Sequence, residues 1–187
     1  MAEKIYIDQG HNPQNPNSGA EGNGLREQDL VYTIGVRLSE ILRAGGLTTR
    51  LSRPSPTTQL GTSVATSLAA RVNDANSWGA DYFISLHTNA SSVTTASGSE
   101  CFVYSEGSPA YALAENVAFQ LNAATGLRDR GVFTRPSLYV LRRTAMPAVL
   151  VELGFITNPF DAELMRSSPE VFAAGVANGV FAYLGLL

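Results

Sequence analysis

The chain contains only two histidines, His11 and His87, and each follows a short apolar run. Two glutamates stand at comparable places, because Glu27 opens a segment with helical periodicity and Glu152 ends a continuous apolar run. Zinc in catalytic sites is usually bound by three histidine or carboxylate side chains, with a fourth position left for water. The metal lowers the pKa of that water to about 7, and a carboxylate that does not bind the metal can then act as general base. These residue types predict a hydrolytic zinc centre.

Each of these residues also has a simpler explanation. A lone histidine is more often structural than a metal ligand, and Glu27 alone could complement the dipole of the helix that it begins. Glu152 could be an ordinary paired carboxylate. Glu21 competes with Glu27 as a ligand, but it lies in a loop rich in glycine and asparagine with no rigid element to orient it. The combination favours a metal site, whereas no single member establishes it.

The elements that would position these side chains alternate along the chain. Strands are expected at residues 4–8, 47–52, 81–87, 100–104 and 148–152, and a short one at 138–141. Helices are expected from residue 27 to the glycine pair at 45–46 and over residues 67–77, 110–124 and 169–183. Strands that alternate with longer helices predict an α/β fold with a mostly parallel sheet covered on both faces.

The predicted topology brings the four candidate residues to one place. In open α/β sheets, ligands bind outside the carboxyl ends of the strands. His11, His87 and Glu152 each stand at or just after the end of a predicted strand. Glu27 opens the first helix, which begins at the same edge of the sheet. We therefore expect all four side chains to meet at one rim.

Composition limits the class of protein. The chain has 187 residues, of which 44% are hydrophobic and 16% charged, with a net charge of -3. This predicts a single globular domain over residues 1–187 and gives no basic surface for nucleic acid or anionic membranes. The single cysteine, Cys101, excludes an intrachain disulfide and is expected to be a buried, inert thiol. No signal peptide and no membrane span are expected, and we expect a monomer.

Several segments resemble the zinc-dependent N-acetylmuramoyl-L-alanine amidases of the type 3 family, which cleave bacterial peptidoglycan. The resemblance runs from about residue 4 to the C-terminus, and the stretches at 83–89 and 146–158 are the most specific. The matching segments are IDQGH at 7–11, Gly19-Ala20, Leu68 and Arg71 before Ala75-Asn76, FISLHTN at 83–89, Gly126-Leu127, Arg130-Gly131, LYVLR at 138–142 and MPAVLVELGFITN at 146–158.

The resemblance implies a role for each candidate. It implies that His11, Glu27 and His87 bind Zn²⁺ and that Glu152 is the catalytic acid/base, and so it selects Glu27 over Glu21. The implied fold is an open, twisted, mostly parallel sheet of about six strands with helices on both faces. The implied substrate is the muramyl peptide of peptidoglycan, cut between N-acetylmuramic acid and L-alanine. Asn89, close to His87 in sequence, is expected to contact the substrate as an oxyanion donor.

Two loops depart from the family's pattern. Residues 12–18 carry Pro13 and Pro16 where family members usually have paired glycines and an aspartate. The loop at 54–66, rich in Pro, Ser and Thr, is longer than the pattern requires. Neither departure touches a metal ligand. We therefore expect a substrate groove of altered shape beside an intact metal site.

Other functions fit the sequence less well. A zinc carboxypeptidase typically has its first two ligands three residues apart, but the residue three after His11 is Gln14, which cannot supply the carboxylate. A peptidoglycan-binding module without catalysis would not be expected to keep all four site residues. The amidase is expected to act at the bacterial cell wall, as a phage lysin, a sporulation enzyme or part of a secreted autolysin.

Overall fold

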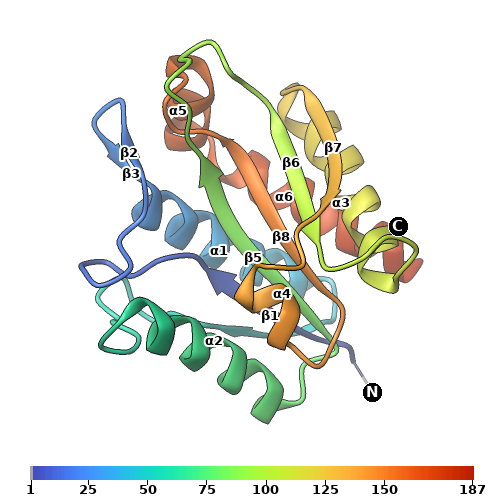
Figure 1. The fold of residues 1–187 in the computed structure, drawn as a ribbon. Helices are drawn as coiled ribbons and strands as arrows, with labels where there is room; N and C mark the ends of the chain where they lie inside the picture. Colours follow the sequence, from blue (N-terminus) through green and yellow to red (C-terminus); the bar gives the residue numbers. More distant parts are fainter. Residues whose placement is uncertain (1) are drawn as a thin grey trace.

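The computed structural model describes residues 2–187. Its central sheet has six strands in the order β4-β1-β5-β8-β6-β7 (Figure 1). The strands are β1 (Lys4–Gln9), β4 (Thr48–Leu51), β5 (Tyr82–Asn89), β6 (Ser99–Val103), β7 (Asp129–Thr134) and β8 (Ala148–Phe155), and β2 (Glu21–Gly22) and β3 (Leu25–Arg26) form a small separate hairpin. The helices are α1 (Glu27–Ala44), α2 (Val64–Trp78), α3 (Pro109–Thr125), α4 (Tyr139–Arg143), α5 (Pro159–Ser167) and α6 (Pro169–Leu184).

Most neighbouring strands of the sheet run parallel. β1 pairs in parallel with β4 and β5, and β5 pairs in parallel with β8. β6 runs antiparallel to β8, whereas β6 and β7 are parallel to each other. Parallel neighbours need long crossover connections, and α1 and α2 provide them between the first strands. The predicted α/β fold with a mostly parallel, six-stranded sheet is confirmed.

The two faces of the sheet carry different layers of helices. Ile5 and Ile7 of β1 pack toward α1, α3 and α6, while Tyr6 between them packs toward α2 and α4. Successive side chains of a strand point to opposite faces, so a strand covered on both sides contains a nearly continuous run of apolar residues. Figure 1 shows α2 and α4 on the near side of the sheet and α1, α3 and α6 behind it.

The structure corrects one predicted element. Residues 138–141 were expected to form a short strand, but Tyr139–Arg143 is helix α4. Val140 and Leu141 are buried in the cluster that also contains residues of α2. The run at 138–141 is therefore apolar because one side of the short helix packs against that cluster. A run of four apolar residues cannot distinguish a buried strand from a buried helical turn.

The sequence patterns also missed four elements, began the second helix late and ended two strands early, since β5 runs to Asn89 and β8 to Phe155. The second helix begins at Val64, three residues before the expected start, because Ser63 and Thr66 form a capping box. The edge strand β7 is largely exposed and lacks an apolar pattern, and the short helix α5 begins at Pro159 after the cap residue Asn158. The hairpin β2–β3 lies where a loop was expected. No helix within residues 2–187 combines the length and the apolar character needed to cross a membrane.

Candidate metal centre and active site

The four candidate residues occupy one edge of the sheet. His11 lies two residues after the end of β1, and Glu27 is the first residue of α1. His87 and Glu152 lie on the adjacent parallel strands β5 and β8, where they are direct register partners. Glu21, the rival ligand, lies apart in the hairpin with a side chain that is 71% exposed and faces Arg26 at 4.0 Å.

Two imidazoles converge on one carboxylate. Nε2 of His11 lies 3.2 Å from Oε1 of Glu27, and Nδ1 of His87 lies 3.1 Å from the same oxygen. One ligand atom from each residue lies within 4.8 Å of the other two. The rings meet edge to face, with centroids 4.8 Å apart. Two imidazole nitrogens and one carboxylate oxygen form a donor set that suits Zn²⁺.

Glu27 is held in place by the backbone. Its Oε1 accepts a hydrogen bond from the amide of Thr88 at 2.9 Å, and its Oε2 accepts one from Ala20 at 2.8 Å. Burial disfavours the charged carboxylate, but the hydrogen bonds from His11 and His87 outweigh this and hold the pKa of Glu27 well below its ordinary value. The side chain is therefore an ionised carboxylate whose orientation is fixed by two backbone amides.

The turn after β1 allows the two histidines to approach each other. A Cβ atom on Gly10 would lie 2.5 Å from Cε1 of His87, so only glycine permits this contact. His11 itself has a φ of 64°, a left-handed conformation that is uncommon for residues other than glycine. In this backbone conformation the His11 imidazole lies against Glu27.

Glu152 has different surroundings from Glu27. Its Oε2 is buried without a hydrogen-bond partner among the described residues. Burial, together with the nearby charges of Glu27 and Glu100, raises the pKa of Glu152 to about 8. A carboxyl group that gains and loses a proton near neutral pH has the property required of a general acid and base.

Asn89 makes contacts that its sequence position did not reveal. Its Nδ2 donates to Oε1 of Glu100 at 2.6 Å, and its Oδ1 accepts from the amide of Ala90. The other oxygen of Glu100 pairs with Nε of Arg130 at 3.1 Å. Glu100 is also the cross-strand partner of Glu152. The sequence placed Glu100 at the start of a strand, but only the reversed direction of β6 brings it to this edge.

The loops at residues 12–18 and 54–66 are joined by hydrogen bonds of Asn12. Its Nδ2 donates to the carbonyls of Pro16 and Leu60 at 2.8 and 2.9 Å, and its Oδ1 accepts from the Leu60 amide at 3.1 Å. Gln59 adds longer hydrogen bonds to the carbonyls of residues 14 and 15. The loop that follows the first ligand is therefore supported by the loop before α2.

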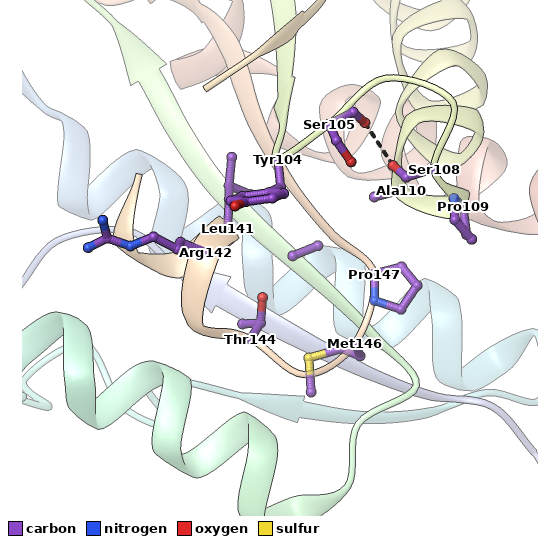
Figure 2. Close-up of a pocket in the computed structure, with 11 residues that line it drawn as sticks. Tyr104, Ser105, Ser108, Pro109, Ala110, Leu141, Arg142, Thr144, Met146 and Pro147 are labelled. Atoms are coloured by element: carbon purple, nitrogen blue, oxygen red, sulfur yellow. Dashed lines mark hydrogen bonds between the residues drawn. The ribbon is translucent and has the colours of Figure 1, made fainter. Parts of the chain in front are cut away.

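Two cavities lie near these elements. One of about 120 Å³ is lined by His11, His87 and Arg71 and by apolar residues of α2 and α4, so it opens on the histidine cluster. A second of about 300 Å³ lies between the end of β6, the start of α3 and α4. Figure 2 shows it, with Tyr104 and Arg142 on one side and the Ser105–Ser108 hydrogen bond at its rim. It contains none of the four candidate residues.

The chain is similar in sequence and in fold to known proteins. Residues 5–182 match the profile of a family described as N-acetylmuramoyl-L-alanine amidase. The chain is 39% identical to N-acetylmuramoyl-L-alanine amidase CwlM of Bacillus licheniformis, covering 95% of this chain and 67% of that one. It is 37% identical to N-acetylmuramoyl-L-alanine amidase LytC of Bacillus subtilis, of which it spans only 36%. The solved structure of N-acetylmuramoyl-L-alanine amidase AmiC2 of Nostoc punctiforme superposes with a TM-score of 0.86 at 31% identity, covering 98% of this chain and 97% of that one.

Proposed function

Because the chain belongs to the N-acetylmuramoyl-L-alanine amidase family, we propose that it is a Zn²⁺-dependent amidase that cleaves peptidoglycan between N-acetylmuramic acid and L-alanine. Residues 1–187 form its catalytic domain, which acts as a monomer at the bacterial cell wall. The observation that carries the proposal is the convergence of the His11 and His87 nitrogens on one oxygen of Glu27. A carboxylate fixed by two backbone amides between two imidazoles is an arrangement suited to a divalent metal.

Each ligand has a definite part in this site. His11, Glu27 and His87 would hold the ion, and the ion would polarise the scissile carbonyl and lower the pKa of a water molecule. Glu27 is unsuited to proton transfer, because both of its oxygens already accept backbone hydrogen bonds and its pKa is held low. The proton must therefore be handled by another group.

Glu152 is the group that can move the proton. In the ionised form it accepts a proton from the water that attacks the lactyl carbonyl carbon. It then returns this proton to the alanine nitrogen as the carbon–nitrogen bond breaks. The products are the free lactyl carboxyl group on the sugar and a stem peptide with a free amino terminus. A pKa that burial and neighbouring carboxylates raise supports both halves of this cycle.

Asn89 has a narrower part than its sequence position suggested. Its amide already donates one hydrogen bond to Glu100, and its carbonyl oxygen accepts one from the backbone. One N–H therefore remains that could face the substrate. We propose that this group assists in binding the oxyanion, with Glu100 fixing the orientation of the amide.

Digestion of purified peptidoglycan tests the proposed function. We expect the protein to release intact stem peptides whose amino terminus is L-alanine, identified by mass spectrometry of the soluble fragments. A chelator should abolish the release and added Zn²⁺ should restore it. Release of single terminal amino acids would indicate a carboxypeptidase instead, and activity that survives chelation would contradict the metal-dependent mechanism.

A further inference from the structure

Two arginines are buried directly beneath the first candidate ligand. Arg53 is 0% exposed and Arg71 is 1% exposed. Arg71 pairs with the buried carboxylate of Asp8 at 2.5 Å, but Arg53 makes no ion pair in the part of the chain that the structure describes. Burying a guanidinium without a carboxylate is unfavourable unless its hydrogen-bond donors are well satisfied. The Nε of each arginine has no hydrogen-bond partner among the described residues, so the contacts of both groups are made by their Nη1 and Nη2 atoms.

Both guanidinium groups donate to the same backbone carbonyl. Nη1 of Arg53 lies 3.2 Å from the carbonyl oxygen of His11, and Nη2 of Arg71 donates to that oxygen as well. Nη1 of Arg71 also donates to the carbonyl of Gln9 at 2.7 Å. The carbonyls of the turn after β1 thus accept hydrogen bonds from Arg53, in the loop after β4, and from Arg71 of α2.

Arg53 also connects this turn to the second ligand. Its Nη2 donates to the carbonyl of Gln28 at 2.9 Å, and Gln28 follows Glu27 in the first turn of α1. One planar guanidinium therefore joins the backbone of one ligand to the backbone beside another. The ring of Tyr32 lies 5.3 Å from the guanidinium carbon, which limits its movement.

The turn after β1, whose carbonyls accept these hydrogen bonds, contains a residue in an unfavourable backbone conformation. His11 has a φ of 64°, and a non-glycine residue stays in this region only where its surroundings over-determine the conformation. A relaxed φ would swing the imidazole away from Glu27, since the side chain follows the backbone at its own residue. The arginines hold the carbonyl of this same residue, so they act on the torsion that aims the ligand.

We propose that Arg53 and Arg71 are positioning residues for the metal centre, which keep His11 in its left-handed conformation by holding its carbonyl oxygen. The proposal rests on the proposed function, because it assumes that the imidazole of His11 binds Zn²⁺. Lysine cannot replace either arginine, since one ammonium cannot reach two or three carbonyls in the fixed geometry of a guanidinium fork. A conservative change should therefore weaken metal binding while the positive charge is retained.

The test measures Zn²⁺ affinity directly. Arg53→Lys and Arg71→Lys are compared with the wild type by competition against a chromophoric chelator, at a temperature where circular dichroism shows each metal-free protein to be folded. We expect each variant to lose about 10–100-fold in affinity, the range found when groups that orient metal ligands are removed. The double variant should lose less than the product of the two factors, because both arginines act on one carbonyl.

Three further comparisons distinguish a role of the arginines in positioning His11 from a general contribution to the stability of the fold. Arg37→Lys, on the exposed side of α1 where Arg37 pairs with Glu40, should bind Zn²⁺ as the wild type does. The visible absorption of the Co²⁺ forms should change in the buried-arginine variants, because the ligand geometry changes. Tyr32→Leu loosens Arg53 without removing a donor, so it should lose less affinity in the same direction and serves if the lysine variants do not fold.

The outcomes are distinct. Folded Arg53→Lys or Arg71→Lys proteins with wild-type Zn²⁺ affinity would overturn the positioning role and leave the proposed function intact. Wild-type affinity in Tyr32→Leu, with no folded arginine variant, would also overturn it. By contrast, a wild-type protein that binds Zn²⁺ but leaves peptidoglycan intact would refute the proposed function and leave the affinity comparison valid.

Discussion

Glu27 and Glu152 lie at the same edge of the sheet, but their surroundings shift the pKa values of their carboxyl groups in opposite directions. Glu27 lies between two imidazoles and two backbone amides, and these donors hold its pKa low in spite of burial. Oε2 of Glu152 has no donor within residues 2–187, and burial and the charges of Glu27 and Glu100 raise the pKa of this group to about 8. The contrast supports the proposed roles, with Glu27 in metal binding and Glu152 in proton transfer.

Replacement of the acid/base provides the most direct test at the residue scale. Glu152→Gln keeps the size of the side chain but cannot exchange a proton, so we expect turnover to fall by about 10²–10⁴-fold. The Zn²⁺ content of the purified variant, measured by elemental analysis, should equal that of the wild type. Glu163→Gln, at an exposed pair with Arg166 on α5, is the matched control and should keep full activity. Wild-type turnover in Glu152→Gln would refute the assignment.

The raised pKa of Glu152 also predicts how the stability of the metal-free protein depends on pH. A carboxyl group whose pKa rises on folding stabilises the fold below its unfolded pKa, and this contribution is lost as the pH rises through the folded value. Between about pH 4.5 and pH 8, the free energy of unfolding of the wild type should therefore fall relative to that of Glu152→Gln. Urea denaturation in the presence of a chelator measures both. Parallel pH profiles would contradict the raised pKa.

At the scale of elements, the site depends on where strands and helices begin and end. His11 follows the end of β1 and Glu27 starts α1, while Arg71 lies in the second turn of α2, which Ser63 caps. The cap is reciprocal: Oγ of Ser63 accepts from the amide of Thr66 at 3.1 Å, and the Thr66 hydroxyl accepts from the amide of Ser63 at 2.9 Å. The helix that carries a buried arginine thus has a defined start.

Removal of this cap should destabilise the protein without altering its chemistry. For Ser63→Ala we expect a loss of about 0.5–2 kcal/mol in the free energy of unfolding, measured by chemical denaturation. Zn²⁺ affinity at a temperature well below the transition should stay unchanged. Ser92→Ala, in an exposed loop and not at a helix cap, should be neutral. Equal stability of the two variants would show that the capping box has little effect.

Sequence patterns predicted the elements that are apolar and long, and missed those that are not. The three parallel strands that carry or precede His11, His87 and Glu152 were predicted because burial on both faces gives each of them a run of apolar residues. The edge strand β7 has no such pattern. The direction of β6 could not be predicted either, because an apolar run does not reveal whether its strand is parallel or antiparallel to its neighbours. For this reason Glu100, which only the antiparallel register brings beside Glu152, was missed.

At the scale of the whole molecule, the layer behind the sheet relies on close contact between two helices. A Cβ atom on Gly179 of α6 would lie 2.4 Å from the Cα of Val117 on α3. The helices can approach this closely only because the residue at the crossing has no side chain. Buried residues of α3 and α6 belong to the same core cluster as residues of β6 and β8.

Enlargement of Gly179 should disturb this layer. Alanine has a higher helix propensity than glycine, but the added methyl group of Gly179→Ala would force α3 and α6 apart. We therefore expect a net loss of about 1–3 kcal/mol in the free energy of unfolding. Asn178→Ala, one residue earlier on α6, is the control and should be neutral or slightly stabilising. Thermal or urea denaturation compares them. A Gly179→Ala protein more stable than the wild type would show that the helices adjust without strain.

The hydrogen bonds of Asn12 have a consequence for engineering. Because Asn12 joins residues 12–18 to the loop before α2 through Pro16 and Leu60, the two segments form one interchangeable unit. A chimera that imports only the first loop from a relative would leave the Leu60 amide and carbonyl without their partner. A chimera that imports both loops keeps an internally matched pair. The two loops are thus best exchanged together, as a single unit.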